Sequence, residues 1–591
     1  MYRTPKTQAI GCGGKRRGSV LIVVLVLVMM LTLAVYGFTE RMLIENQAAV
    51  AHGRAAQAMS CAASGIEFAA STVSLRAADP ANSISLYHRP DLFAGVILYE
   101  SASPSAVGRF SLVAPLAGDP TASLVRFGLS DESGKLNINS ITATDLDEIE
   151  QATMLMGLPG MTEELTDAIL DYLDDDQTPR PLGAESDYYQ GLAMPYFAKN
   201  GPLESVNELL MVRGVTPELL FGEDANRNGL LDPAENDGAN SPPLDNADGM
   251  LQMGWNQFLT VYSRESNSRA DGTPKILINQ KQLTDLYDAI VTETGDKEIA
   301  KFIAAYRMYG PKDGEEESGE GEAGRGDGER EGDGEGETGS DRSEASDGRD
   351  DEEVGNSDEE SRSESDERER GGGEDRESGE SAEAGSEESE DAMRDGLDLS
   401  RGGQHEIKSL YDLIDREVEI EADEEAGTEA KTLTSPWTSA GILTDYPMLL
   451  DLFALSEKPS IVGRVNVNEA RYEVLMGLPG MTEQIADNIV GARGSVSGGA
   501  VAADPSRQTT AWLVAQNFVV LETMRKLDPF LTGRGDVFRV QSVGFFDGGG
   551  PRARVEAIID GTAIPAKIVM YRDLTALHRG YTPIQLLGNG G

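Results

Sequence analysis

The stretch that decides the fold is residues 15–38, KRRGSVLIVVLVLVMMLTLAVYGF, a basic leader followed at once by an uncharged apolar run. The run from Val20 to Phe38 is 19 residues long. As a helix with a rise of about 1.5 Å per residue it spans roughly 28 Å, close to the ~30 Å hydrocarbon core of a bilayer. The basic residues before the run hold the N-terminus in the cytoplasm and send the chain after Glu40 outward. We therefore expect a single-pass membrane anchor at 20–38.

The leader differs from an ordinary secretory signal, which has a shorter apolar core and a small-residue cleavage site at its far end. The far end of this run offers only Ala34, whereas the basic leader ends in a glycine directly before the helix. This arrangement predicts that residues 1–18 are a leader, removed by cleavage between Gly18 and Ser19. A signal anchor that keeps its leader is the alternative.

Residues 39–75 are expected to continue the helix, because they are rich in alanine and no proline occurs before Pro80. Small side chains allow such a helix to pack closely on a domain or on neighbouring helices. Short runs with β-branched and aromatic residues lie in 76–135 and again in 536–578, where Pro and Gly separate them. We expect strands in both ranges.

The middle of the chain reads as mainly helical in 136–310 and again in 405–535, with one helix expected over 280–308. Within these ranges short strands are expected at 259–263 and 275–279, and residues 463–468 give a further strand signal. The expected fold class is therefore α+β, a long N-terminal helix packed on a small antiparallel sheet. A large inserted all-helical domain and a disordered acidic insert complete this expectation.

Charge is distributed unevenly along the chain. It carries 51 basic and 101 acidic residues, a net charge of −50, which disfavours nucleic acid and anionic lipid as partners of the outer part. Residues 311–400 hold 37 acidic and 10 basic residues, more than half of the excess. A segment of Glu, Asp, Gly, Ser and Arg cannot bury enough apolar surface to fold, so we expect 311–404 to be disordered.

The nine residues LMGLPGMTE occur twice, at 155–163 and 475–483, and each copy follows a related tetrapeptide, LNIN or VNVN. Each copy predicts a helix, a Gly-Leu-Pro-Gly turn and a second helix, which resembles a helix-hairpin-helix. Many such hairpins bind DNA through backbone N–H groups of the turn. Here Glu163 and Glu164 stand where a phosphate would bind, so a protein-packing hairpin is favoured. A looser third copy is expected at 209–220.

The polar segment DANRNGLLDPAE at 224–235 has the spacing of an EF-hand calcium loop. Oxygen donors fill positions one, three, five, seven, nine and twelve, the seventh through its backbone carbonyl. These residues are Asp224, Asn226, Asn228, Leu230, Asp232 and Glu235. Gly229 occupies position six, where the chain turns sharply. We expect a lone structural calcium site, and a polar turn without metal is the alternative.

A second acidic group could hold another ion, although a solvated acidic face explains it equally well. Its members are Asp171, Asp174, Asp175, Asp176 and Glu185. Of these, Asp174, Asp176 and Glu185 are the core of the possible second calcium site.

Neither disulfide nor catalytic patterns emerge from the sequence. Cys12 lies in the leader, so Cys61 has no partner for an intrachain disulfide after cleavage. The four histidines are scattered, and the sequence contains no CxxC pair, Ser-His-Asp arrangement or phosphate loop. We therefore expect that the protein is not an enzyme.

Four longer stretches carry a resemblance to a known family. They are FGLSDESGKLNIN at 127–139, DYLDDDQTPRPLGAESDYY at 171–189, NGPLESVNELLMVRGV at 200–215 and VNVNEARYEVLMGLPG at 465–480. Together with the leader they resemble the minor pseudopilin K of type II secretion systems, also called general secretion pathway protein K. The resemblance covers most of 15–310 and 405–575, and the acidic insert departs from the family's usual pattern.

The resemblance implies that a prepilin peptidase removes the leader and that the protein caps a short pseudopilus. Most pilin-like proteins carry Glu at the fifth mature residue, which here is Val23. Lacking that Glu is typical of K subunits, which have no subunit above them.

The implied partners are minor pseudopilins I and J, exported proteins and the inner membrane, with the bulk of the chain periplasmic and no nucleic acid bound. The family also binds calcium. The alternatives are a membrane-anchored, pilin-like DNA-binding or uptake protein that uses its hairpins, and a membrane-anchored enzyme.

Overall fold

The computed structural model describes most of the chain outside the leader and the acidic insert. The described residues are 18–78, 85–100, 103, 106–116, 123–143, 146–242, 245–312, 392–420, 430–493, 505–577 and 580–588. The expected leader therefore lies almost wholly outside them, and so does most of the expected disordered segment. The residues up to Pro311 and from Arg394 onward form one structural unit.

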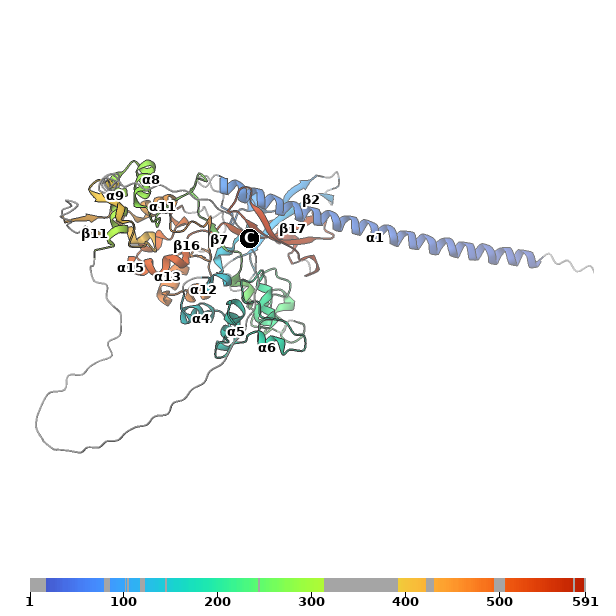
Figure 1. Cartoon of the computed structure of the whole chain (residues 1–591). Coiled ribbons are helices and arrows are strands. Elements are labelled where there is room, and N and C mark those ends of the chain that lie inside the picture. Colours follow the sequence, from blue (N-terminus) through green and yellow to red (C-terminus); the bar gives the residue numbers. More distant parts are fainter. Residues whose placement is uncertain are drawn as a thin grey trace, which may run out of the picture. The chain divides into compact units, whose positions relative to one another are not determined.

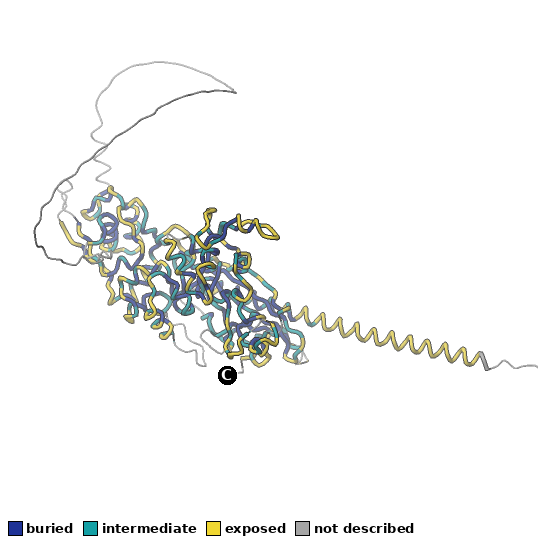
Figure 2. Tube along the Cα trace, turned by 90° about the horizontal axis from the view of Figure 1, so that it is seen from below, coloured by how far each residue is buried: buried dark blue, intermediate teal, exposed yellow. Residues whose placement is uncertain are grey.

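Helix α1 (Gly18–Ala78) runs unbroken through 61 residues, as the alanine-rich sequence predicts. Among the described residues it is the one helix long and apolar enough to cross a membrane, and Figure 2 shows its N-terminal part exposed. Its C-terminal part buries small and branched side chains against a sheet. A Cβ added at Gly544 of that sheet would lie 2.0 Å from the Ala58 carbonyl oxygen, so the glycine is what lets helix and sheet touch.

An antiparallel sheet lies against α1, with five strands in the order β1-β2-β17-β18-β19. They are β1 (Val96–Tyr99), β2 (Gly108–Pro115), β17 (Val537–Phe546), β18 (Ala553–Asp560) and β19 (Lys567–Asp573). Two short strands join it, β3 (Val125–Phe127) beside β2 and β4 (Ser130–Asp131) beside β17. Blue β2 and red β17 are neighbours in Figure 1, with Leu112 opposite Ser542. The α+β fold, a long helix on a small antiparallel sheet, is thereby confirmed.

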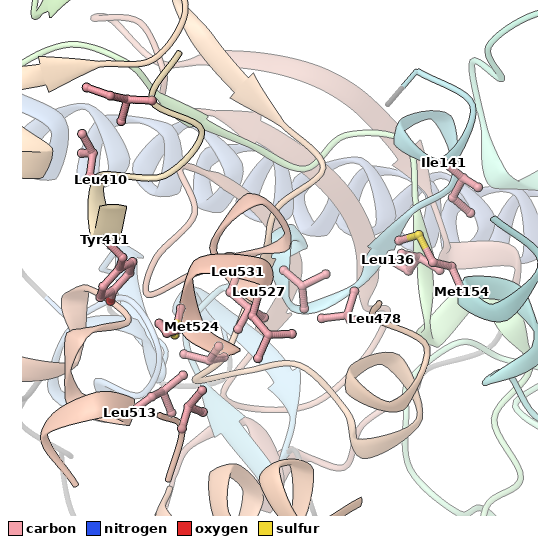
Figure 3. Packing of buried hydrophobic residues seen from close by; sticks show 14 of the residues in the cluster. Leu136, Ile141, Met154, Leu410, Tyr411, Leu478, Leu513, Met524, Leu527 and Leu531 are labelled. Atoms are coloured by element: carbon pink, nitrogen blue, oxygen red, sulfur yellow. The ribbon is translucent and has the colours of Figure 1, made fainter. Parts of the chain in front are cut away.

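A large region is inserted between β4 and β17, and one hydrophobic core runs through it from Leu136 to Leu531. Figure 3 shows side chains from both sides of the acidic insert in this core, among them Met154, Tyr411 and Leu527. The two expected helical ranges therefore belong to one packed region.

The expectation that this region is all-helical is wrong. It contains several strand pairs two to four residues long, for example β7 (Arg264–Ser266) with β14 (Ser460–Val462) and β11 (Glu417–Ile420) with β12 (Lys431–Thr434). These four strands are too short to give a periodic signal in the sequence, whereas the strands expected within 259–263, 275–279 and 463–468 are present.

Three modules with one plan make up the inserted region. In each, a two-residue strand at the start pairs in parallel with a two-residue strand at the end. The pairs are β5 (Leu136–Asn137) with β6 (Leu259–Thr260), β8 (Ile276–Leu277) with β13 (Phe453–Ala454), and β15 (Val465–Asn466) with β16 (Leu531–Thr532). After its first strand, which in the first module is followed by the short helix α3 (Ile138–Ile141), each module has two helices. They are α4 (Glu148–Met156) and α5 (Glu163–Leu173), α8 (Leu283–Thr294) and α9 (Lys297–Tyr309), and α12 (Tyr472–Met476) and α13 (Glu483–Ala492).

An asparagine at the same offset ties each module together. Asn139 donates to the Leu203 carbonyl and accepts from its N–H, both at 2.8 Å. Asn279 makes the same pair of bonds to Ile407, at 2.9 and 3.0 Å. Asn468 donates to two carbonyls farther along the third module. The middle module, which lacks the LMGLPGMTE sequence, is the one that the acidic insert interrupts.

The two LMGLPGMTE copies lie against each other. Gly157 and Gly477 end the first helix of each copy, and Thr162 and Thr482 cap the second, as the sequence predicts. A Cβ at Gly477 would lie 2.6 Å from the Met154 carbonyl oxygen, and one at Gly157 would lie 3.1 Å from the Gly477 nitrogen. Both glycines have an ordinary helical φ, −67° and −77°, so they are needed for space and not for conformation.

Two expected boundaries are wrong. Ordered structure resumes before residue 404, because Leu397 and Leu399 supply apolar side chains that are buried in the core. The helix expected over 280–308 is two helices, α8 and α9, because Gly295 ends the first in the left-handed region at a φ of +69°.

The remaining helices are short. They are α2 (Pro90–Phe93), α3 (Ile138–Ile141), α6 (Ser186–Gln190), α7 (Pro217–Phe221), α11 (Ile442–Leu452), α14 (Ala511–Ala515), α15 (Leu521–Leu527) and α16 (Pro583–Leu586).

Candidate functional site

The loop 224–235 belongs to the first module and follows α7 directly. Asp224 shapes it, since its carboxylate accepts hydrogen bonds from the N–H groups of Asn228 at 3.1 Å and Gly229 at 2.9 Å. Gly229 has a φ of +69°, which allows the sharp turn expected at position six. A 3-10 turn, Pro233–Glu235, then brings the last carboxylate back toward the first.

The side chains of the loop converge. The Asp232 carboxylate accepts from the amides of Asn226 at 2.6 Å and Asn228 at 3.0 Å. The Asn226 amide also lies 3.3 Å from Glu235 Oε1. Asn226 Oδ1 is buried and has no hydrogen-bond partner among the described residues. The structure thus brings the side chains of Asn226, Asn228, Asp232 and Glu235 together and leaves the buried Asn226 oxygen free for a ligand.

Burial acts on the two end carboxylates of the loop. Asp224 is 4% exposed and Glu235 is 3% exposed. Burial raises the pKa of Asp224 to about 6 and the pKa of Glu235 to about 7. A cation held between them would compensate the loss of water, and hard oxygen donors in this order suit Ca²⁺. The residues present therefore fit the ion, and the Leu230 side chain is buried in the core of the sheet.

The second acidic group also forms a cluster. Asp174, Asp176 and Glu185 bring carboxylate oxygens within 4.8 Å of one another. Arg180 pairs with Asp174 at 2.6 Å and with Asp171 at 2.8 Å. Neither oxygen of Glu185, which is 5% exposed, has a hydrogen-bond partner among the described residues. Burial, followed by the nearby aspartates, raises the pKa of this carboxyl.

The structure shows less of the leader site. Gly18 and Ser19 are the first residues of α1, and the leader before them lies outside the described residues. Val23 stands exposed on the same helix. Cleavage between Gly18 and Ser19 therefore stays a prediction.

Sequence reasoning missed the residues that hold the loop in place. Gln541, Arg554 and Tyr581 each donate a hydrogen bond to a backbone carbonyl of the loop, from more than 300 residues away. No motif or spacing in the sequence connects them with the loop. Their contribution follows only from the insertion of the first module into the sheet.

The architecture defines the class of protein, an α+β protein with a long apolar N-terminal helix on an antiparallel sheet and helical modules inserted into that sheet. Residues 134–221 match the family described as "Type II secretion system (T2SS), protein K". This match confirms, over residues 134–221, the resemblance of the sequence motifs to protein K of type II secretion systems.

Two proteins of type II secretion systems share limited similarity with the chain. A putative type II secretion system protein K from Escherichia coli (strain K12) is 37% identical over 60 residues. That match covers 10% of this chain and 18% of the relative, so it spans less than a fifth of the relative's length.

A chain in the crystal structure of the GspK-GspI-GspJ complex from enterotoxigenic Escherichia coli is 9% identical, with a TM-score of 0.32. The match covers 88% of this chain and 97% of the solved chain. A TM-score of that size carries no argument about fold or partners.

Proposed function

We propose that the protein is a minor pseudopilin that caps the tip of a type II secretion pseudopilus and supports export of folded proteins across the outer membrane. The observation that carries the proposal is the protein K domain at 134–221, inserted into the sheet that packs on a membrane-length helix. Three inserted modules widen the subunit beyond its sheet, which would obstruct a further subunit above it.

The proposal includes the anchor and its processing. The apolar part of α1 would sit in the inner membrane with the bulk of the chain periplasmic, after prepilin peptidase removes the leader. Val23, in place of Glu, removes the acid that would pair with the N-terminal amine of another subunit. Minor pseudopilins I and J are the proposed neighbours.

Co-purification tests this function directly. Full-length protein extracted in detergent should retain the I and J subunits, and deletion of its gene should abolish secretion while the other subunits are still produced. Restoration of secretion by a Gly18→Val variant that stays uncleaved would contradict the processing step. Binding of duplex DNA by the periplasmic part at physiological salt would favour the uptake alternative instead.

We also propose that the loop 224–235 holds a structural calcium ion and that Asp174, Asp176 and Glu185 hold a second one. The orphaned Asn226 oxygen and the unpaired Glu185 carboxylate support these two sites. Calorimetric titration of parent and Glu185→Gln should show one binding event fewer in the variant. Asp187→Asn, an exposed acid in the same helix, is the matched control and should bind like the parent.

A further inference from the structure

Three consecutive carbonyls on the outside of the loop 224–235 are tied to the pilin-like sheet. The Asn226 carbonyl accepts from the Arg554 guanidinium of β18. The next carbonyl, of Arg227, accepts from the Gln541 amide of β17 at 2.7 Å. The third, of Asn228, accepts from the Tyr581 hydroxyl at 3.0 Å. These three hydrogen bonds, which we call the clamp, hold the backbone of residues 226–228, from which candidate ligand side chains project.

The clamp is buried and leaves little freedom. Arg554 is 1% exposed and Tyr581 is 3% exposed. The Tyr581 hydroxyl also lies 3.0 Å from Gln541 Oε1, so this oxygen and the Asn228 carbonyl share its single proton. Arg227 keeps a φ of +58°, a left-handed conformation that a side chain rarely adopts unless its surroundings impose it.

The same contacts seat the C-terminal segment 580–588. The Asn228 amide donates to the Gly580 carbonyl at 2.6 Å. Tyr581 and Leu586 are buried in the core of the sheet, and the Leu586 carbonyl accepts from Ser111 at 2.7 Å. Asn228, a proposed ligand, therefore contacts this segment through both its backbone and its side chain.

We propose that Gln541, Arg554 and Tyr581 are positioning residues for the calcium ion, and that ion binding and seating of the segment 580–588 are one coupled equilibrium. This inference rests on the calcium site proposed above. None of the three residues contacts the ion. They fix the backbone from which the ligands project, and the ion in turn fixes the carbonyls that they bind. Such coupling is reciprocal, so weakening either contact weakens the other.

The calcium affinity of Tyr581→Phe tests whether Tyr581 is a positioning residue for the ion. We expect it to fall about tenfold, the lower end of the loss seen when residues behind metal ligands are changed. The measurement uses full-length protein in detergent with Glu185→Gln as background, so that the loop is the site titrated. Tyr571→Phe, which removes the hydroxyl of a half-exposed tyrosine on β19, should bind as tightly as the background. If Tyr581→Phe does not fold, Gln541→Ala takes its place and should show the same loss.

Hydrogen exchange of the unaltered protein tests whether ion binding and seating of the segment 580–588 are coupled. Amides in 580–588 should exchange faster in chelator than in calcium, while those of β19 stay unchanged. Asp224→Asn with Glu235→Gln should abolish this response. Absence of calcium binding in the parent would overturn the site itself. Calcium binding with equal affinity in Tyr581→Phe, or with no change of exchange in 580–588, would leave the site standing and overturn the coupling.

Discussion

The first and third modules share nine identical residues and the same hairpin, yet their surroundings differ. After its hairpin the first module carries both acidic groups, the cluster around Glu185 and the loop 224–235. The third module follows its hairpin with Arg493, whose half-buried guanidinium donates to the carbonyls of Val467 and Ala470. One hairpin can thus lead into a candidate ion site or into a self-contained core. The comparison teaches that the repeat supplies a scaffold and that the segments after it supply the chemistry.

The largest expected effect comes from breaking the contact between the two hairpins. Gly477→Ala would place a Cβ 2.6 Å from the Met154 carbonyl oxygen, and backbone cannot yield as a flexible side chain can. We expect a loss of about 1–3 kcal/mol in the free energy of unfolding, the range for overpacked cores. Urea denaturation measures it.

The control for that substitution lies in the second helix of the same hairpin. A Cβ at Gly491 of α13 would meet nothing within 4 Å. Gly491→Ala should therefore stabilise the protein, by up to about 1 kcal/mol, because alanine favours the helix. Equal stability of Gly477→Ala and the parent would show that the hairpins do not press on each other.

Asp224→Ala together with Glu235→Ala tests whether the loop 224–235 of the first module binds an ion. At a calcium concentration of 100 times Kd, the bound ion would contribute about 2.7 kcal/mol to stability. We expect the melting temperature of the double variant to fall several degrees further below the parent's in calcium than in chelator, where hydrogen bonds within the loop, such as those of Asp224 to Asn228 and Gly229, are lost but no ion is. Melting curves that coincide in both buffers would remove the role of the ion in the loop.

The stability of the third module is expected to depend on pH through Glu469. Glu469 is half-buried beside Asp131 of β4, whose N–H donates to it at 3.1 Å, and the positive charges of Arg126 and Arg76 lower its pKa by less than burial raises it. Burial raises the pKa of Glu469 to about 7, above its ordinary value of 4.5. The folded state therefore binds the proton more tightly than the unfolded state. The stabilisation that protonated Glu469 gives the folded state is complete below the pKa of Glu469 in the unfolded state. It is lost as the pH rises through the pKa of Glu469 in the folded state.

Glu469→Gln should make the free energy of unfolding less dependent on pH. Between pH 5 and pH 8 the parent should lose stability, and the variant, which has no proton to lose at this position, should lose less. Urea midpoints across this range give the measurement. A variant whose midpoint falls with pH as steeply as the parent's would contradict the assignment. Glu473→Gln, a change of another acid in the same module, is the control and should keep the parent's slope.

The smallest effect is expected in the middle module. Replacing 313–391 by a short Gly-Ser linker removes most of the acidic insert and leaves the core residues Leu397 and Leu399 in place. The melting temperature should stay within about 2 °C of the parent's, because surface changes away from packed features usually cost little. Loss of soluble, folded protein would mean that the insert holds the module together.

Several features were predictable because they depend on neighbours in sequence. The helix from Gly18 needs only an unbroken apolar and alanine-rich run, and the hairpins need only their caps at Gly157, Thr162 and their counterparts. The spacing of oxygen donors in 224–235 likewise identified side chains that converge in the structure. The strands β17, β18 and β19 were visible as alternating β-branched runs.

The sequence by itself thus determined the membrane-length helix, the hairpins and the set of candidate calcium ligands, since each is local and carries its own periodicity or spacing. Only the tertiary structure decided that β2 pairs with β17, that the middle module repeats the other two and that Tyr581 holds the Asn228 carbonyl. These are contacts between segments hundreds of residues apart, or strands only two residues long. They are selected by the burial of a shared core and not by the propensity of any one segment.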